Sequence, residues 1–152
     1  MKNEQDAEEV VQDSFIKAFQ RINTFRGESK FSTWFFRIVY YTAISKSRIK
    51  KLPLQHLENK DFETTDFADV NHAISNLNQE DRKLLLQKAM GKLNESDFTL
   101  LTLYYFEEKK LSEIAFITGI RRNYLKVLLQ RARKKLYYSI NASVKTEIKE
   151  LL

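Results

Sequence analysis

The chain has 152 residues, of which 30% are charged and 43% hydrophobic, and its formal net charge is +6. It contains no cysteine, which excludes a disulfide framework, a thiolate zinc site and a thiol nucleophile. No apolar run is long enough to span a bilayer, and the amino-terminal residues lack the layout of a signal peptide, so we expect a soluble cytoplasmic protein.

The composition favours helices throughout. Three glycines and one proline leave few helix breakers, whereas apolar residues recur at helical spacing and nowhere alternate as in a strand. The sequence therefore predicts an all-α protein made of two small helical domains joined by a flexible acidic linker. We expect the domains at residues 1–52 and 71–152, with the linker at 53–70, where the only proline falls.

Two helices are predicted before the linker. Asp6 and Glu9 have the spacing of a capping box, and the apolar period that follows predicts a helix over 6–23. The stretch "NTFRGES" breaks that period. A second helix is expected over 32–51, with Trp34 on its apolar side and therefore in the core.

Four helices are predicted after the linker. They span 70–91, a segment capped by Asn94 together with Asp97, a short segment at 111–118, and a long one at 122–139. Between the last two, Ala115, Gly119 and Leu125 have the spacing of a helix-turn-helix: a small residue where two helices touch, a turn residue, and an apolar anchor. An ordinary αα-hairpin could show the same spacing.

The long helix has a one-signed polar face. No acid occurs from 114 to 146, although a solvated helix gains from mixing Glu with Lys four residues apart. By contrast, residues 57–69 hold five acids and one lysine. The separation predicts a carboxy-terminal surface for phosphates. We expect one group of residues to read base edges in the major groove (Arg121, Arg122, Asn123, Lys126) and another to hold phosphates (Gln130, Arg133, Lys134).

Two sequence blocks together resemble one family. The stretch "LYYFEEKKLSEIAFITGIRRNYLKVLLQRARKKL" is similar to the promoter-binding carboxy-terminal domain of bacterial RNA polymerase sigma factors of the extracytoplasmic-function group. Upstream, "DAEEVVQDSFIKAFQRINTFRGESKFSTWFFRI" resembles the second half of that family's other conserved domain. The resemblance implies a sigma factor that binds core RNA polymerase and promoter DNA, recognising the minus 35 element through the helix-turn-helix and the minus 10 element through the first domain.

The resemblance also implies roles for individual residues. The first block matches the helix that docks on the polymerase, which makes its polar and edge positions candidates for that contact (Asp6, Gln12, Asp13, Phe15, Lys17). Val10, Val11 and Phe19 are expected in the core instead. The stretch "FRGESKFSTWFFRIVYY" matches the part that holds unpaired bases of the minus 10 element. Such bases need aromatic surfaces and nearby cations, which this stretch can supply (Arg26, Lys30, Arg37, Tyr40, Tyr41).

The first helix falls closer to the amino terminus than in the resembled family, so we expect an N-terminally shortened sigma domain two. Either the sequence starts late or is a fragment, which we favour, or the apolar face of the first helix is buried by a partner such as polymerase, an anti-sigma protein or a second copy. Two alternatives share the motifs: a helix-turn-helix regulator that binds duplex DNA only, and a sigma-like module that sequesters a regulator without initiating transcription. An enzyme is not expected, because His56 and His72 have no partner at ligand or triad spacing, and we predict no metal site, cofactor or membrane insertion.

Overall fold

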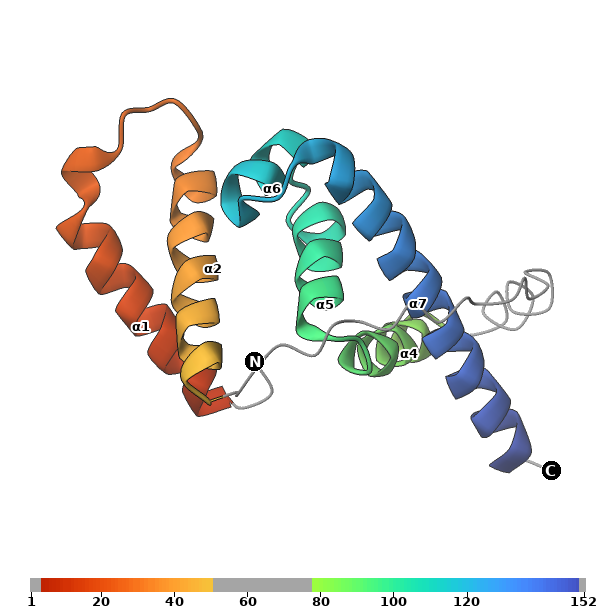
Figure 1. The fold of residues 1–152 in the computed structure, drawn as a ribbon. Coiled ribbons are helices and arrows are strands. Elements are labelled where there is room, and N and C mark those ends of the chain that lie inside the picture. The colour runs from red at the N-terminus through yellow and green to blue at the C-terminus, as the bar shows by residue number, and fades with distance from the viewer. Residues whose placement is uncertain (1–3, 51–77, 151–152) are drawn as a thin grey trace. The chain divides into compact units, whose positions relative to one another are not determined.

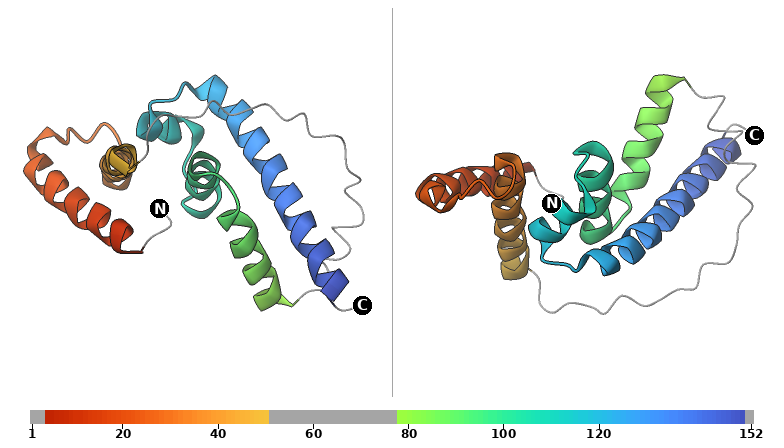
Figure 2. Two further views of the ribbon diagram at one scale, coloured as in Figure 1. Left: turned by 60° about the horizontal axis from the view of Figure 1, so that its bottom comes forward. Right: turned by 90° about the horizontal axis from the view of Figure 1, so that it is seen from above.

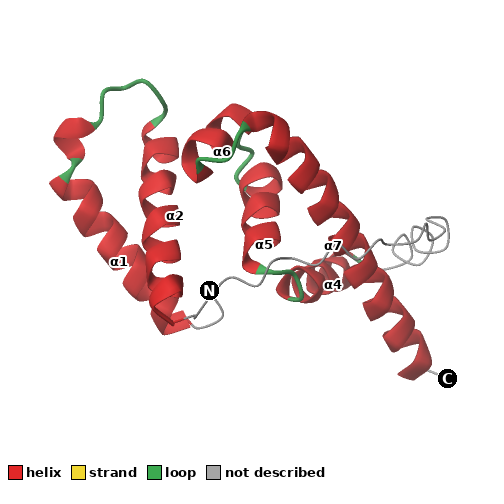
Figure 3. Cartoon of the chain, viewed as in Figure 1, coloured by secondary structure: helices red, strands yellow, loops and turns green. Residues whose placement is uncertain are grey.

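The described part of this computed structural model comprises residues 4–50 and 78–150, and every regular element in it is a helix (Figure 1, Figure 3). The prediction of an all-α fold is confirmed. The predicted linker, 53–70, lies outside the described residues. No helix of the described part is both long enough and apolar enough to cross a membrane.

The chain forms two compact units that do not follow chain order. The first unit combines Met1–Leu57 with Glu107–Leu125, and the second combines Glu58–Phe106 with Lys126–Leu152. The domain boundaries expected from the sequence stay a prediction.

The first unit contains two long helices side by side, α1 (Glu4–Gln20) and α2 (Phe31–Lys50), with the short 3₁₀ turn η1 (Ile22–Thr24) after α1 (Figure 1). The short helix α6 (Leu111–Thr118) packs against α2.

The buried face of α1 is narrow because its residues are small. Val10, Ser14 and Ala18 are buried, and the Ser14 hydroxyl donates to the Val10 carbonyl oxygen at 2.5 Å. Small side chains four residues apart lie on one helix face and let a neighbouring helix approach closely. Two lysines then connect α1 to α2. Lys17 donates to the Thr42 hydroxyl at 3.2 Å, and Lys46 forms ion pairs with Glu9 and, at 3.9 Å, with Asp6.

Three predictions for α1 are wrong. Asp6 lies inside the helix rather than at its cap, because α1 already includes Glu4, and the α-helix ends at Gln20 rather than at residue 23. Val11 and Phe19, expected in the core, are 46% and 84% exposed. Val10 and Ala18 are buried instead, so the buried face of α1 does not include Val11 and Phe19.

An aromatic cluster lies at the start of α2. The rings of Phe25, Phe31 and Trp34 have centroids 5.5 to 5.7 Å apart, and Trp34 is half-buried among them. The fully buried position of this turn is Thr33, which the apolar period did not indicate.

The second unit contains α4 (Gln79–Gly91), α5 (Glu95–Leu101), the π-helical segment η2 (Thr102–Phe106) and the larger part of α7 (Arg122–Glu150). The Asn94 cap is confirmed, since its side chain accepts from the Asp97 N–H at 2.8 Å. An equivalent cap at Asn78 starts α4 at residue 79, and the predicted start of this helix at residue 70 lies outside the described residues.

The helix α7 is longer than predicted and is the longest helix of the described residues. Its residues Leu129 and Ala132 are buried, as are Leu85 on α4 and Leu100 on α5. Figure 2 shows α4 beside the carboxy-terminal half of α7, where the Ser139 hydroxyl donates to a carbonyl oxygen of α4 at 3.2 Å. No Gly or Pro follows residue 139, and nothing therefore stops the helix there.

Candidate nucleic-acid interface

The turn between α6 and α7 has the backbone that the sequence predicted. Helix α6 spans Leu111–Thr118 as expected, and Gly119 follows in the left-handed region with φ of 74°. Its N–H donates to the Ala115 carbonyl oxygen at 2.9 Å, closing the helix end. Leu125, the predicted anchor, is fully buried.

The polar face of α7 is accessible. All the residues predicted to contact the duplex are exposed: Arg121, Arg122, Asn123, Lys126, Gln130, Arg133 and Lys134. Lys135 differs from its neighbour Lys134, because its ammonium group donates to the buried Asp97 carboxylate at 2.5 Å. The helix thus presents a row of cations on its solvent side and uses one lysine internally.

Arg133 also contacts two aromatic rings, which the sequence did not predict. Its guanidinium carbon lies 5.5 Å from the ring centroid of Tyr104 and 5.4 Å from that of Tyr105. Both distances are within the range of a cation–π interaction.

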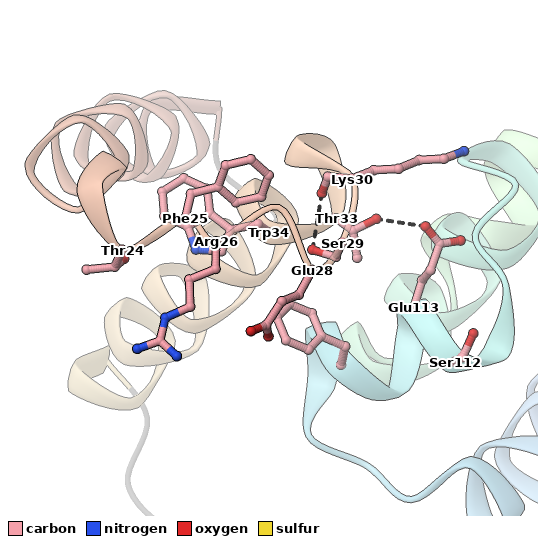
Figure 4. Close-up of a pocket in the computed structure, with 11 residues that line it drawn as sticks. Thr24, Phe25, Arg26, Glu28, Ser29, Lys30, Thr33, Trp34, Ser112 and Glu113 are labelled. Atoms are coloured by element: carbon pink, nitrogen blue, oxygen red, sulfur yellow. Dashed lines mark hydrogen bonds between the residues drawn. The ribbon is translucent and has the colours of Figure 1, made fainter.

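The predicted minus 10 residues fall in two places. Arg26 and Lys30 line a pocket of about 510 Å³ together with Phe25 and Trp34 (Figure 4). The pocket therefore combines cations with aromatic rings, which are the two components that an unstacked base needs.

Arg37, Tyr40 and Tyr41 are not among the residues that line this pocket. Arg37 donates to the Phe116 carbonyl oxygen on α6, and its guanidinium carbon lies 4.8 Å from the Phe116 ring centroid. The Tyr41 hydroxyl donates to the Thr118 carbonyl oxygen at 3.4 Å. Tyr40 is half-buried, with its ring centroid 5.4 Å from that of Tyr41. In this arrangement Arg37 and Tyr41 bind α6.

A carboxylate of α6, that of Glu113, lines the pocket and links α6 to α2 by a hydrogen bond. Glu113 accepts from the Lys110 backbone N–H at 2.9 Å and from the Thr33 hydroxyl at 2.8 Å; Figure 4 shows Thr33 and Glu113 pointing toward one another. The hydrogen bond from the Lys110 backbone has the larger effect and that from Thr33 the smaller, and both lower the pKa of Glu113. The nearby charges of Lys109 and Lys30 act in the same direction. The sequence offered no signal for the Thr33 contact.

The predicted polymerase contacts differ in accessibility. Gln12, Asp13 and Phe15 are exposed on α1, whereas Asp6 and Lys17 are half-buried and bind residues of α2. Within the described ranges, no group of His, Asp and Glu side chains could hold a metal ion.

Comparison with known proteins identifies both parts of the chain. Residues 1–51 match the family described as Sigma-70 region 2, and residues 83–136 match Sigma-70, region 4. The sigma factor SigV of Bacillus subtilis is 34% identical over 136 residues, covering 88% of this chain and 75% of that protein. The extracytoplasmic-function sigma factor SigW of the same organism is 30% identical over 141 residues, with 88% and 75% covered.

Solved structures agree on the fold. The sigma factor RpoE from Bartonella quintana, in complex with the anti-sigma factor NepR, aligns with a TM-score of 0.65 at 18% identity, covering 93% of this chain and 84% of that chain. CnrH, in complex with the cytosolic domain of CnrY, aligns with a TM-score of 0.59 at 21% identity, covering 92% and 74%.

Regions 2 and 4 in this order define a promoter-recognition subunit of bacterial RNA polymerase. The chain belongs to the sigma factors of the extracytoplasmic-function group. It directs RNA polymerase to promoters, where transcription is initiated.

Proposed function

We propose that the exposed polar face of α7 holds the promoter duplex at the minus 35 element. Arg121, Arg122, Asn123 and Lys126 stand at the amino-terminal end of the helix, the end that helix-turn-helix proteins direct at base edges. The observation that carries the proposal is that every predicted duplex residue is exposed while Leu125, on the opposite side, is fully buried.

The pocket at the start of α2 takes an unpaired base of the minus 10 element in this proposal. Arg26 and Lys30 hold the strand backbone, and the rings of Phe25 and Trp34 replace the stacking that the base loses on leaving the helix. Arg37 and Tyr41 join this contact only after releasing α6, since their polar groups bind α6 carbonyl oxygens in the described structure.

The partners follow from this role. Core RNA polymerase docks on the exposed side of α1 through Gln12, Asp13 and Phe15, with Asp6 and Lys17 at the edge. One solved relative is a complex with an anti-sigma factor and the other a complex with the cytosolic domain of CnrY, and we infer an anti-sigma partner here as well. In this proposal the role is one of binding rather than of catalysis, and the protein acts in the cytoplasm.

The proposal is tested by replacing Arg122, Lys126 and Arg133 with Gln in one variant. Promoter occupancy and specific transcripts formed with core polymerase should both fall at least tenfold, because three phosphate or base contacts are lost. Association with core polymerase, measured by pull-down, should not change. Undiminished occupancy at physiological salt would refute the assignment of α7.

A further inference from the structure

Two consecutive tyrosines of the segment η2 lie close together on the same side of that segment. In a π-helix the hydrogen bonds run from residue i to i+5, so each turn takes more residues and consecutive side chains diverge less than in an α-helix. Tyr104 and Tyr105 lie in this segment, with ring centroids 5.0 Å apart and an interplanar angle of 79°. One ring therefore presents its edge to the other.

Arg133 lies against this pair. Its guanidinium carbon is nearly equidistant from the two centroids, at 5.5 Å from Tyr104 and 5.4 Å from Tyr105. A cation over a ring face is attracted without using any N–H donor, so the donors of the guanidinium stay available for an acceptor. Arg133 is exposed, and Tyr105 is 51% exposed.

We propose that Tyr104 and Tyr105 are positioning residues that hold Arg133 ready for a backbone phosphate of duplex DNA. The inference rests on the proposed function of α7. An arginine in solution samples many rotamers, and binding must restrict them. Here the two rings restrict the side chain before DNA arrives, which lowers the entropic cost of the phosphate contact. The rings add no charge of their own.

The positioning role predicts a particular effect of salt. Affinity for a duplex depends on salt with a slope set by the number of phosphates neutralised, about 0.9 per phosphate in the logarithmic plot. Loss of a ring leaves that number unchanged and weakens binding equally at every salt concentration. Loss of the Arg133 charge reduces the slope.

The experiment measures binding of the full chain to a labelled random-sequence duplex of 25 base pairs between about 50 and 200 mM salt. No promoter sequence is needed, because phosphate contacts do not depend on sequence. Tyr105→Leu should weaken binding about three- to fivefold with the slope unchanged, whereas Tyr105→Phe, which keeps the ring, should stay within about twofold. Arg133→Gln should lower the slope by about 0.9.

Three controls make the result decisive. Phe106→Leu changes a ring of the same segment that makes no cation–π contact with Arg133 among the described residues, and it should bind normally. The double variant of Tyr105→Leu and Arg133→Gln should bind no more weakly than Arg133→Gln alone. Thermal unfolding checks that each variant is folded.

Three negative results are distinguishable. If Tyr105→Leu binds as well as the wild type while Arg122→Gln and Lys126→Gln are impaired, the positioning role is wrong and the duplex surface stands. If Arg122→Gln and Lys126→Gln also keep full affinity and slope, the proposed function of α7 fails. If Tyr105→Leu impairs only the association with core polymerase, the two tyrosines belong to a protein-binding surface and the inference is wrong.

Discussion

The hydroxyl oxygen of Tyr41 lies 2.8 Å from the point that a Cβ atom on residue 119 would occupy. Gly119 is therefore required for two reasons, since its φ of 74° is also one that side-chain-bearing residues rarely adopt. Gly27 has a similar φ of 71° but no heavy atom within 4 Å of its virtual Cβ. Substitution at Gly27 therefore tests backbone strain alone, whereas substitution at Gly119 tests backbone strain together with a steric contact.

We expect Gly27→Ala to lower the free energy of unfolding by about 1 kcal/mol, from backbone strain alone. Gly119→Ala should cost about 2 kcal/mol, because Tyr41 must also move away from Thr118 and Arg37. In a Tyr41→Phe background, which removes the obstructing oxygen, the cost of Gly119→Ala should approach that of Gly27→Ala. Urea unfolding measures all three differences, and equal costs for the two glycines in the wild type would show that Tyr41 does not lie against the turn.

Local signals in the sequence were enough for several elements. The Asn94 cap, the bounds of α6 and the left-handed Gly119 depend on residues within a few positions of one another, and each is confirmed. The residues predicted to contact the duplex were also chosen from local sequence, because a helix face that carries charged and amide side chains is expected to be exposed. Their accessibility is confirmed, and their contacts stay a prediction.

Contacts between distant residues gave no such signal. Thr33 and Glu113 are 80 residues apart, and neither belongs to a recognisable motif with the other. Lys134 and Lys135 look alike in the sequence, and only the position of Asp97 distinguishes them. For α1, the period of large apolar residues indicated the wrong face, because the residues that are buried there include the small side chains of Ser14 and Ala18.

The two adjacent lysines provide a direct test of that distinction. Lys134→Gln should reduce the salt slope of duplex binding by about 0.9 without changing stability, because an exposed phosphate contact is lost. Lys135→Gln should lower the free energy of unfolding by about 1 to 3 kcal/mol, because it leaves the buried Asp97 carboxylate without its ion pair. Its effect on the slope should be small. The same slope change in both variants would contradict the inward role of Lys135.

Glu113 should make the stability of the first unit depend on pH. Its pKa is lowered in the folded state, so its stabilising contribution is fully present above the ordinary pKa of a glutamate and is lost as pH falls through the lowered value. The difference in unfolding free energy between wild type and Glu113→Gln should therefore be constant near neutral pH and shrink below about pH 4.3. Glu107→Gln removes an exposed carboxylate nearby and is the matched control. A difference that does not shrink in acid would mean that Glu113 acts through packing and not through its charge.

The contact between α2 and α6 should compete with single-stranded DNA. Arg37 and Tyr41 bind carbonyl oxygens of Phe116 and Thr118, and the same polar groups are proposed to hold the minus 10 strand. The chain has no cysteine, so an introduced pair can be linked selectively. Ser29 and Ser112 line the same pocket, and replacing both with Cys allows a reducible bis-maleimide to bridge α6 to the segment before α2.

The bridged protein should bind a single-stranded minus 10 oligonucleotide about tenfold more weakly than the unbridged one, an effect of about 1.4 kcal/mol. Reduction of the linker should restore binding, because it frees α6 to leave Arg37 and Tyr41. The double cysteine variant carrying two separate maleimides controls for loss of the serines and for bulk in the pocket. If the bridged and reduced forms bind the oligonucleotide equally, Arg37 and Tyr41 do not exchange α6 for DNA, and the minus 10 contact is made by Arg26, Lys30 and the aromatic rings alone.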